Sequence, residues 1–188
     1  DQVPPGRITI GLIGHLKAKK GVDWFLDRLT ESGLGDRVHL LLVGEREPAA
    51  DAALERADGP TSTTLPFRDR EQLLSVLPAC DLVALPSFYD GLPNVALESA
   101  ALGIPLLCSD AGGLADLVDD GIAGYRFRAG DDLDALDALD RAVHATHDER
   151  RRLGAQARSV VVERFSATAE IAGYRSLLAR VGPARDVG

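Results

Sequence analysis

The feature that most constrains the fold is a series of six short apolar runs separated by stretches with helical patterning. Several runs are apolar continuously rather than alternately, which is typical of strands buried on both faces of a parallel sheet. The expected strands are Ile8–Ile13, Val38–Val43, Thr63–Phe67, Leu82–Leu85, Ile104–Cys108 and Tyr125–Phe127. Alternation of strand and helix predicts an α/β fold: a doubly wound, Rossmann-like parallel β-sheet with helices on both faces.

Helix start and stop signals support this fold. They are clearest at Pro93–Leu102, where proline opens the helix and Gly103 follows its last turn. The other expected helices are Lys20–Ser32, Arg70–Leu77, Leu114–Val118, Leu133–Ala145, Asp148–Glu163 and Ala167–Val181. With 188 residues, the chain can fill one hydrophobic core. We expect a linker remnant over residues 1–7, one domain over residues 8–181 and a flexible tail over residues 182–188.

The composition limits the environment and the partners. No apolar run approaches the about 20 residues that span a bilayer, so we expect a soluble protein. A net charge of -8 argues against broad attraction to nucleic acid or to an anionic membrane. Cys80 and Cys108 have apolar neighbours, which favours two buried thiols in a reducing compartment over a disulfide. Because the sequence holds no methionine and opens on Asp1, we expect a piece of a longer protein.

A glycine loop with lysines follows the first expected strand and is the first candidate site. It runs from Gly14 to Gly21 and holds every lysine of the chain, Lys17, Lys19 and Lys20. Glycine lets a backbone approach a ligand, the next helix offers unpaired N–H groups, and lysine supplies charge for phosphate oxygens. The loop matches neither established glycine-rich phosphate motif. Anion binding and a solvated basic turn both stay open.

Two carboxylates mark a second candidate site after the fourth expected strand. Asp90 lies in a glycine-containing turn, and Glu98 lies eight residues later, inside the helix that Pro93 opens. Both could border one ligand, Asp90 from the loop and Glu98 from the helix beneath it. Glu98 stands out beside an apolar helix face, and a carboxylate near a core needs a partner. The face is formed by Val95, Leu97, Ala101 and Leu102. Taken alone, Glu98 could equally be a surface or capping carboxylate.

A third glycine turn, and several residues with weaker signals, complete the survey. Gly112 and Gly113 follow the fifth expected strand, where a tight strand-to-helix turn and a ligand contact are equally open. His39 is interpreted as structural. Histidines and cysteines show no metal-ligand spacing, and the serines lack the setting of a hydrolase nucleophile. Two further histidines, expected to face solvent, are His144 and His147.

In order, these motifs resemble the C-terminal, donor-binding domain of the family 4 (group 1) retaining glycosyltransferases, which have the two-domain GT-B fold. The motifs that carry the resemblance are Gly14…Lys20-Gly21, Val43-Gly44, Pro86-Ser87, Asp90-Gly91-Leu92-Pro93-Asn94…Glu98, Ala101-x-Gly103-x-Pro105 and Gly112-Gly113…Asp116-Leu117-Val118. The resemblance extends from Ile8 to Arg180, and the ordered set is far more specific than any single motif.

The resemblance implies transfer of a hexosyl group from a nucleotide-diphospho-sugar, with retained anomeric configuration, to a glycan, lipid or small-molecule acceptor. It implies no metal or other cofactor. In the family, an N-terminal domain supplies most of the acceptor site, and we expect that domain to lie outside this sequence, leaving the fragment inactive alone. A cytoplasmic location is implied, with any attachment to the inner face of a membrane supplied by that other half.

The same resemblance implies roles for individual residues. Lys20 contacts the donor diphosphate, with Gly14 and His15 in the loop beside it. Glu98 holds the ribose hydroxyls, while Asp90 lies near the transferred sugar and positions it without forming a covalent bond. The turn that holds sugar hydroxyls and phosphate is formed by Gly91, Leu92, Pro93 and Asn94.

Two departures from the family pattern keep alternatives open. The position of Asp90 usually holds glutamate, and that of His15 usually holds arginine, whose charge Lys17 or Lys19 would have to replace. A non-catalytic nucleotide-sugar-binding module, or an epimerase or phosphorylase of the same fold, is therefore the competing hypothesis. Base contacts are expected from the backbone around Leu65–Arg68, so the sequence does not identify the base, the sugar or the acceptor.

Overall fold

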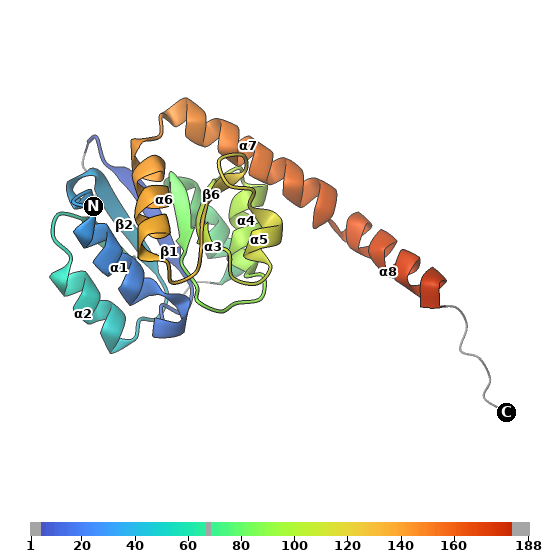
Figure 1. Ribbon diagram of the computed structural model, residues 1–188, viewed down its shortest axis with the longest axis horizontal. Coiled ribbons are helices and arrows are strands. Elements are labelled where there is room, and N and C mark those ends of the chain that lie inside the picture. The colour runs from blue at the N-terminus through green and yellow to red at the C-terminus, as the bar shows by residue number, and fades with distance from the viewer. Residues whose placement is uncertain (1–4, 67–68, 182–188) are drawn as a thin grey trace.

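The computed structural model describes residues 5–66 and 69–181 and contains one six-stranded parallel sheet (Figure 1). Its strand order, β3-β2-β1-β4-β5-β6, confirms the doubly wound fold. The strands are β1 (Ile8–Ile13), β2 (Val38–Val43), β3 (Thr61–Leu65), β4 (Leu82–Leu85), β5 (Leu106–Ser109) and β6 (Gly124–Phe127). Most of the expected linker, the expected tail, and residues Phe67 and Arg68 lie outside the described residues.

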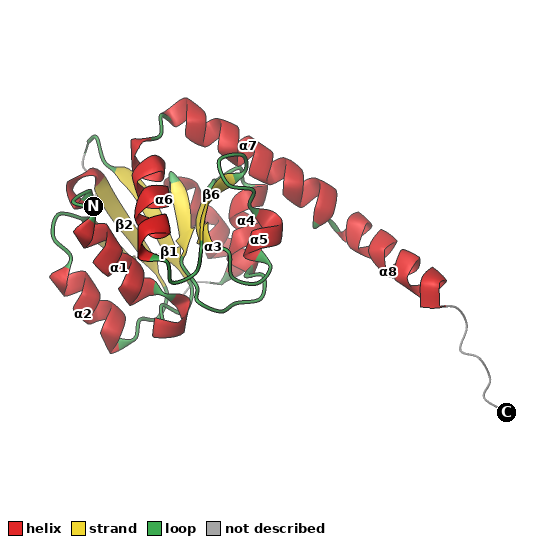
Figure 2. Cartoon of the chain, viewed as in Figure 1, coloured by secondary structure: helices red, strands yellow, loops and turns green. Residues whose placement is uncertain are grey.

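Helices cover both faces of the sheet (Figure 2). One face packs against α1 (Val22–Glu31), α2 (Pro48–Arg56) and α6 (Asp132–His144). The other packs against α3 (Arg70–Val76), α4 (Asn94–Ala101), α5 (Leu114–Leu117) and α7 (His147–Arg164). Every residue of β1, β2, β4 and β5 is buried, as the continuous apolar runs predict. Short 3-10 turns occur at Ala18–Lys20, Gly35–Arg37 and Leu77–Ala79.

Several boundaries differ from the sequence-based expectation, three of them for a clear physical reason. β3 begins at Thr61, because its threonines extend the pairing with β2 along the sheet edge. β5 begins only at Leu106, since the amide of Ile104 still donates to the carbonyl of Ser99 at the end of α4. Pro93 caps α4 from outside, and the helix itself begins at Asn94.

The helix α2 was not expected from the sequence. It begins at Pro48, a favourable first helical position, and only Ala50 and Ala53 bury against α1. Alanine side chains are too small to give a strong apolar period, so the segment lacked the signal that marked the other helices.

The cysteines and histidines occupy the expected environments. Cys80 and Cys108 are buried and unpaired, and burial raises the pKa of each thiol to about 12. His39 is buried in β2, with its Nδ1 2.9 Å from the hydroxyl of Thr61. Its structural role is confirmed. His144 and His147 are exposed.

The last helix, α8 (Ala167–Val181), projects away from the body of the molecule (Figure 1). Its exposed apolar side chains are Ile171, Tyr174, Leu177 and Leu178. Within the described residues, no helix combines the length and the apolar character needed to cross a membrane.

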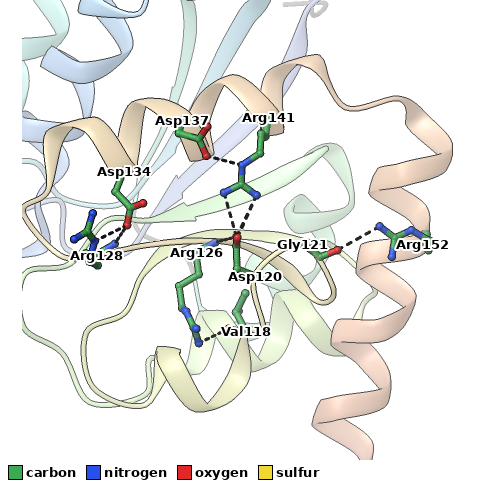
Figure 3. A network of polar contacts seen from close by, with 9 residues as sticks. All are labelled: Val118, Asp120, Gly121, Arg126, Arg128, Asp134, Asp137, Arg141 and Arg152. Carbon is green, nitrogen blue, oxygen red and sulfur yellow. Dashed lines mark hydrogen bonds and ion pairs between the residues drawn. The ribbon is translucent and has the colours of Figure 1, made fainter.

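A polar network ties the segment after α5 to its neighbours (Figure 3). Asp120 accepts a hydrogen bond of 2.8 Å from the amide of Arg126, and its carboxylate lies 3.3 Å from the guanidinium of Arg141 in α6. Arg126 in turn donates to the carbonyl of Val118 at 2.9 Å. The network therefore fixes β6 against α6 on one side and against the end of α5 on the other.

Candidate functional site

The strand order places the candidate site between β1 and β4. The chain winds outward in one direction through β2 and β3, then returns to add β4 on the other side of β1. The connections that leave the carboxyl ends of β1 and β4 therefore diverge and open a crevice, which is where open α/β sheets bind ligands. The lysine loop follows β1 and the Asp90 turn follows β4, so two sequence candidates meet at this point.

The lysine loop packs directly on the segment after β4. Gly21 has a φ of +66°, and a Cβ added there would lie 2.1 Å from the carbonyl oxygen of Pro86. Only glycine fits this approach. The amide of Phe88 donates to the carbonyl of Lys19 at 3.2 Å, which fixes the register of the two loops. Gly21, the second residue of the Lys20-Gly21 pair, thus has a structural cause.

The third glycine turn completes the cluster of loops. Gly112 has a φ of +56°, and a Cβ there would lie 2.0 Å from the carbonyl oxygen of Asp90. The amide of Gly113 donates to the carbonyl of Gly91 at 2.9 Å. The third turn therefore supports the Asp90 turn from behind, and Asp116 lies exposed in the first turn of α5.

Two cavities open at the carboxyl ends of the strands. The first, of about 210 Å³, lies at the lysine loop and the Asp90 turn. The second, of about 420 Å³, extends along α4 toward α3. Both are lined by Ile13, Gly14, His15, Asn94 and Val95, so they form one continuous crevice. Its size and its mainly apolar walls with a few converging polar groups suit a small-molecule ligand.

The lysine nearest the crevice is paired with the first acid. The ammonium of Lys20 contacts Oδ2 of Asp90, and their side chains are 29% and 16% exposed. The hydroxyl of Ser87 also lies 3.3 Å from Oδ2, and the amide of Gly91 donates to Oδ1 at 2.9 Å. Opposite charges thus neutralise each other at the point where the sequence places phosphate and sugar.

The second acid also has a partner. The side chain of Glu98 is only 11% exposed, and its Oε1 accepts a hydrogen bond of 2.8 Å from Nε of Arg70. A carboxylate in this position needs such a partner, as the sequence indicated. The partner comes from α3, which the sequence predicted as a helix without assigning Arg70 any part in the site.

The structure brings most of the predicted site residues together. Those that line the crevice are Gly14, His15, Lys20, Asp90, Pro93, Asn94 and Glu98. Gly91 and Leu92 are not among the described residues that line the two cavities. Their turn packs against Gly113 instead. His15 is exposed, with Nδ1 3.7 Å from a carboxylate oxygen of Glu45.

Several lining residues had no role assigned from the sequence. Arg70 and Leu73 are two of them, and Ser87 and Val43, which belong to motifs of the family resemblance, also form part of the walls. Within the described part of the chain, no group of three or more His, Cys, Asp or Glu side chains is arranged to hold a metal ion. The expectation that no metal is required stays a prediction.

The comparison with protein families identifies the family of this chain. The sequence model for the family described as Glycosyl transferases group 1 matches residues 7–145. The chain belongs to this family. A curated member from Nocardia farcinica, D-inositol 3-phosphate glycosyltransferase, is 32% identical over 164 residues, which are 81% of the chain and 36% of that enzyme. The group 1 chain described here thus spans little more than a third of the length of this relative.

Solved structures agree on the fold of this group 1 domain. Sucrose-phosphate synthase from Thermosynechococcus elongatus matches with a TM-score of 0.73 and 25% identity, covering 95% of the chain and 47% of the synthase. The Anabaena protein HepE, solved in complex with UDP-glucose, matches with a TM-score of 0.71 and 24% identity, covering 92% of the chain and 49% of HepE. The chain therefore corresponds to about half of each of these structures.

Proposed function

We propose that this chain is the donor-binding half of a retaining hexosyltransferase and that its crevice holds a nucleotide-diphospho-sugar. The observation that carries the proposal is the convergence of Lys20, Asp90 and Glu98 on one crevice at the switch point between β1 and β4. HepE, a structural neighbour, was solved with UDP-glucose, which supports a ligand of this class.

The crevice divides naturally along the proposed ligand. The larger cavity, with apolar walls and Glu98, takes the nucleoside, and the smaller one, with Lys20 and Asp90, takes the diphosphate and sugar. Lys20 stabilises the charge that develops on the leaving diphosphate, because a fixed cation needs no reorganisation at the moment of reaction. Asp90 positions the sugar by accepting hydrogen bonds from its hydroxyls. Transfer needs no metal in this proposal.

The acceptor site lies outside this chain in the proposal, in a second domain of a longer enzyme. The proposed setting is the cytoplasm, where the two free thiols stay reduced. Because the curated relative with 32% identity is a glycosyltransferase, transfer is favoured over a non-catalytic module and over epimerase or phosphorylase activity.

The direct test is calorimetric titration of the chain with UDP, GDP and ADP and then with their sugar conjugates. We expect one nucleotide to bind, and Lys20→Ala to weaken that binding at least about tenfold, the effect of losing one charge-assisted hydrogen bond. Arg37→Ala is the control, since Arg37 also carries one positive charge, is exposed and is not among the described residues that line the two cavities. Equal weakening by both variants, or binding of no nucleotide at millimolar concentration, would contradict the proposal.

A further inference from the structure

One cation at the crevice has no assigned role. Arg70, the first residue of α3, is one of the residues that line the larger cavity. It is 78% exposed, whereas the side chain of its partner Glu98 is 11% exposed. The ion pair therefore joins a solvated guanidinium to a carboxylate that is largely withdrawn from water.

The geometry of the contact leaves the carboxylate available to a ligand. Arg70 approaches through Nε and reaches Oε1, at 2.8 Å. Among the described residues, no other hydrogen bond to the Glu98 carboxylate is found, so Oε2 keeps its lone pairs. A carboxylate accepts about four hydrogen bonds, and one guanidinium contact does not saturate it.

The surroundings favour a recognition role over a purely structural one. The cavity wall beside the pair is apolar, formed by Ile13, Val43, Leu73 and Val95. A flat base can lie along such a wall, which leaves the attached ribose near Glu98, the only carboxylate among the described residues of this lining. Because the Arg70 guanidinium is 78% exposed, solvent screens the ion pair and the pair adds little to stability, so its position at the cavity is the more informative property.

We propose that Arg70 is a positioning residue, one that holds the Glu98 carboxylate turned toward the cavity so that Oε2 accepts hydrogen bonds from the ribose hydroxyls. This inference rests on the proposed donor site and deepens it. It predicts that Arg70 acts only on ligands that carry those hydroxyls, because it works through Glu98 and not on the diphosphate.

The test compares a nucleoside diphosphate with its 2′,3′-dideoxy form, which has the same charge and base. Titrations use UDP and GDP, each with its dideoxy analogue, against the wild-type chain and Arg70→Ala. We expect the substitution to weaken the ribonucleotide about three- to tenfold and to leave the dideoxy form unchanged within about twofold. Arg70→Lys, which keeps the charge and one donor group, should fall between wild type and Arg70→Ala.

Arg56→Ala is the matched control, because Arg56 forms an exposed pair with Asp27 at 3.0 Å on another helix. It should change neither affinity. Equal weakening of both ligand forms by Arg70→Ala would overturn the inference, since it would mean a general effect of charge or folding. Tighter ribonucleotide binding would also overturn it. Wild-type chain that binds none of UDP, GDP and ADP would instead sink the proposed donor site itself, and the inference with it.

Discussion

At the scale of single residues, the lysine that should meet the diphosphate is already engaged. Lys20 contacts Asp90 within a pair that is mostly shielded from solvent. An incoming diphosphate must therefore share this ammonium with Asp90 or displace it from Asp90. The Asp90 carboxylate also repels the diphosphate at short range. Ion pairs that hold a binding group in the ligand-free state lower the apparent affinity of the ligand that competes for it.

Asp90→Asn should therefore separate nucleotide binding from sugar transfer. We expect binding of the nucleoside diphosphate without sugar to tighten about three- to tenfold, because the competing charge is removed. Transfer by the longer enzyme should fall, since the amide positions the sugar hydroxyls poorly. Calorimetry and product analysis measure the two effects. Asp116→Asn makes the same charge change at an exposed position and should leave both unchanged; weaker nucleotide binding in Asp90→Asn would refute the competition.

The sequence predicted the main residues of the site, but it did not identify the partner of Glu98. Lys20, Asp90 and Glu98 are marked by glycine turns and helix signals close to them in the sequence. The contact between Arg70 and Glu98 spans 28 residues and depends on how α3 packs beside α4. No local pattern encodes that distance, so the sequence could indicate that Glu98 needs a partner without identifying it.

At the scale of elements, patterning succeeded where side chains are large. β1 and β2 were bounded correctly because nearly all their residues are apolar and every one is buried. The helix α2 was missed because it packs on α1 through alanines. Strand β6 was expected to begin at Tyr125, one residue late. It begins at Gly124, and glycine is uncommon in strands, so the sequence did not mark this residue as part of one.

Polar contacts, which patterning does not reveal, join β6 to its neighbours, and Asp120 is their centre (Figure 3). Asp120→Asn should lower the free energy of unfolding by about 1–2 kcal/mol. The substitution weakens the hydrogen bonds that the carboxylate accepts from the backbone amide of Arg126 and from the guanidinium of Arg141. Denaturant titration measures the change. The matched control is Asp137→Asn, which removes an exposed pair with the same Arg141 within one helix.

That control should cost no more than about 0.5 kcal/mol, the usual contribution of an exposed pair one helical turn apart. If both substitutions cost the same, the network does not hold β6 as inferred. A smaller slope against denaturant for Asp120→Asn would show instead that the ensemble has changed in compactness.

At the scale of the whole molecule, the strand order decides which residues meet. Alternation of strand and helix predicted a doubly wound sheet, yet only the completed order places β4 beside β1 and so brings Asp90 next to Lys20. The loops then lock together through Gly21 and Gly112, whose missing side chains admit neighbouring carbonyls. The site is thus a property of the complete sheet, because no single element brings its residues together.

The two thiols report on the integrity of this sheet. Cys80 and Cys108 belong to the same hydrophobic core, the one beneath α4 and α7, and burial raises the pKa of each to about 12, so neither forms the reactive thiolate at pH 8 while the chain is folded. We expect an aromatic disulfide reagent to label neither thiol in the native protein, and both once denaturant unfolds it. Single Cys→Ala variants assign each signal.

The same labelling connects the core to the crevice. A nucleotide that binds only the folded chain lowers the open population, so at a concentration of about 100 times its Kd it should slow labelling about 100-fold. That slowing should affect both thiols equally if opening is global, because each lies in the core and neither lines the crevice among the described residues. Protection of one thiol alone would show that the sheet opens in parts, with the ligand stabilising only the strands it touches.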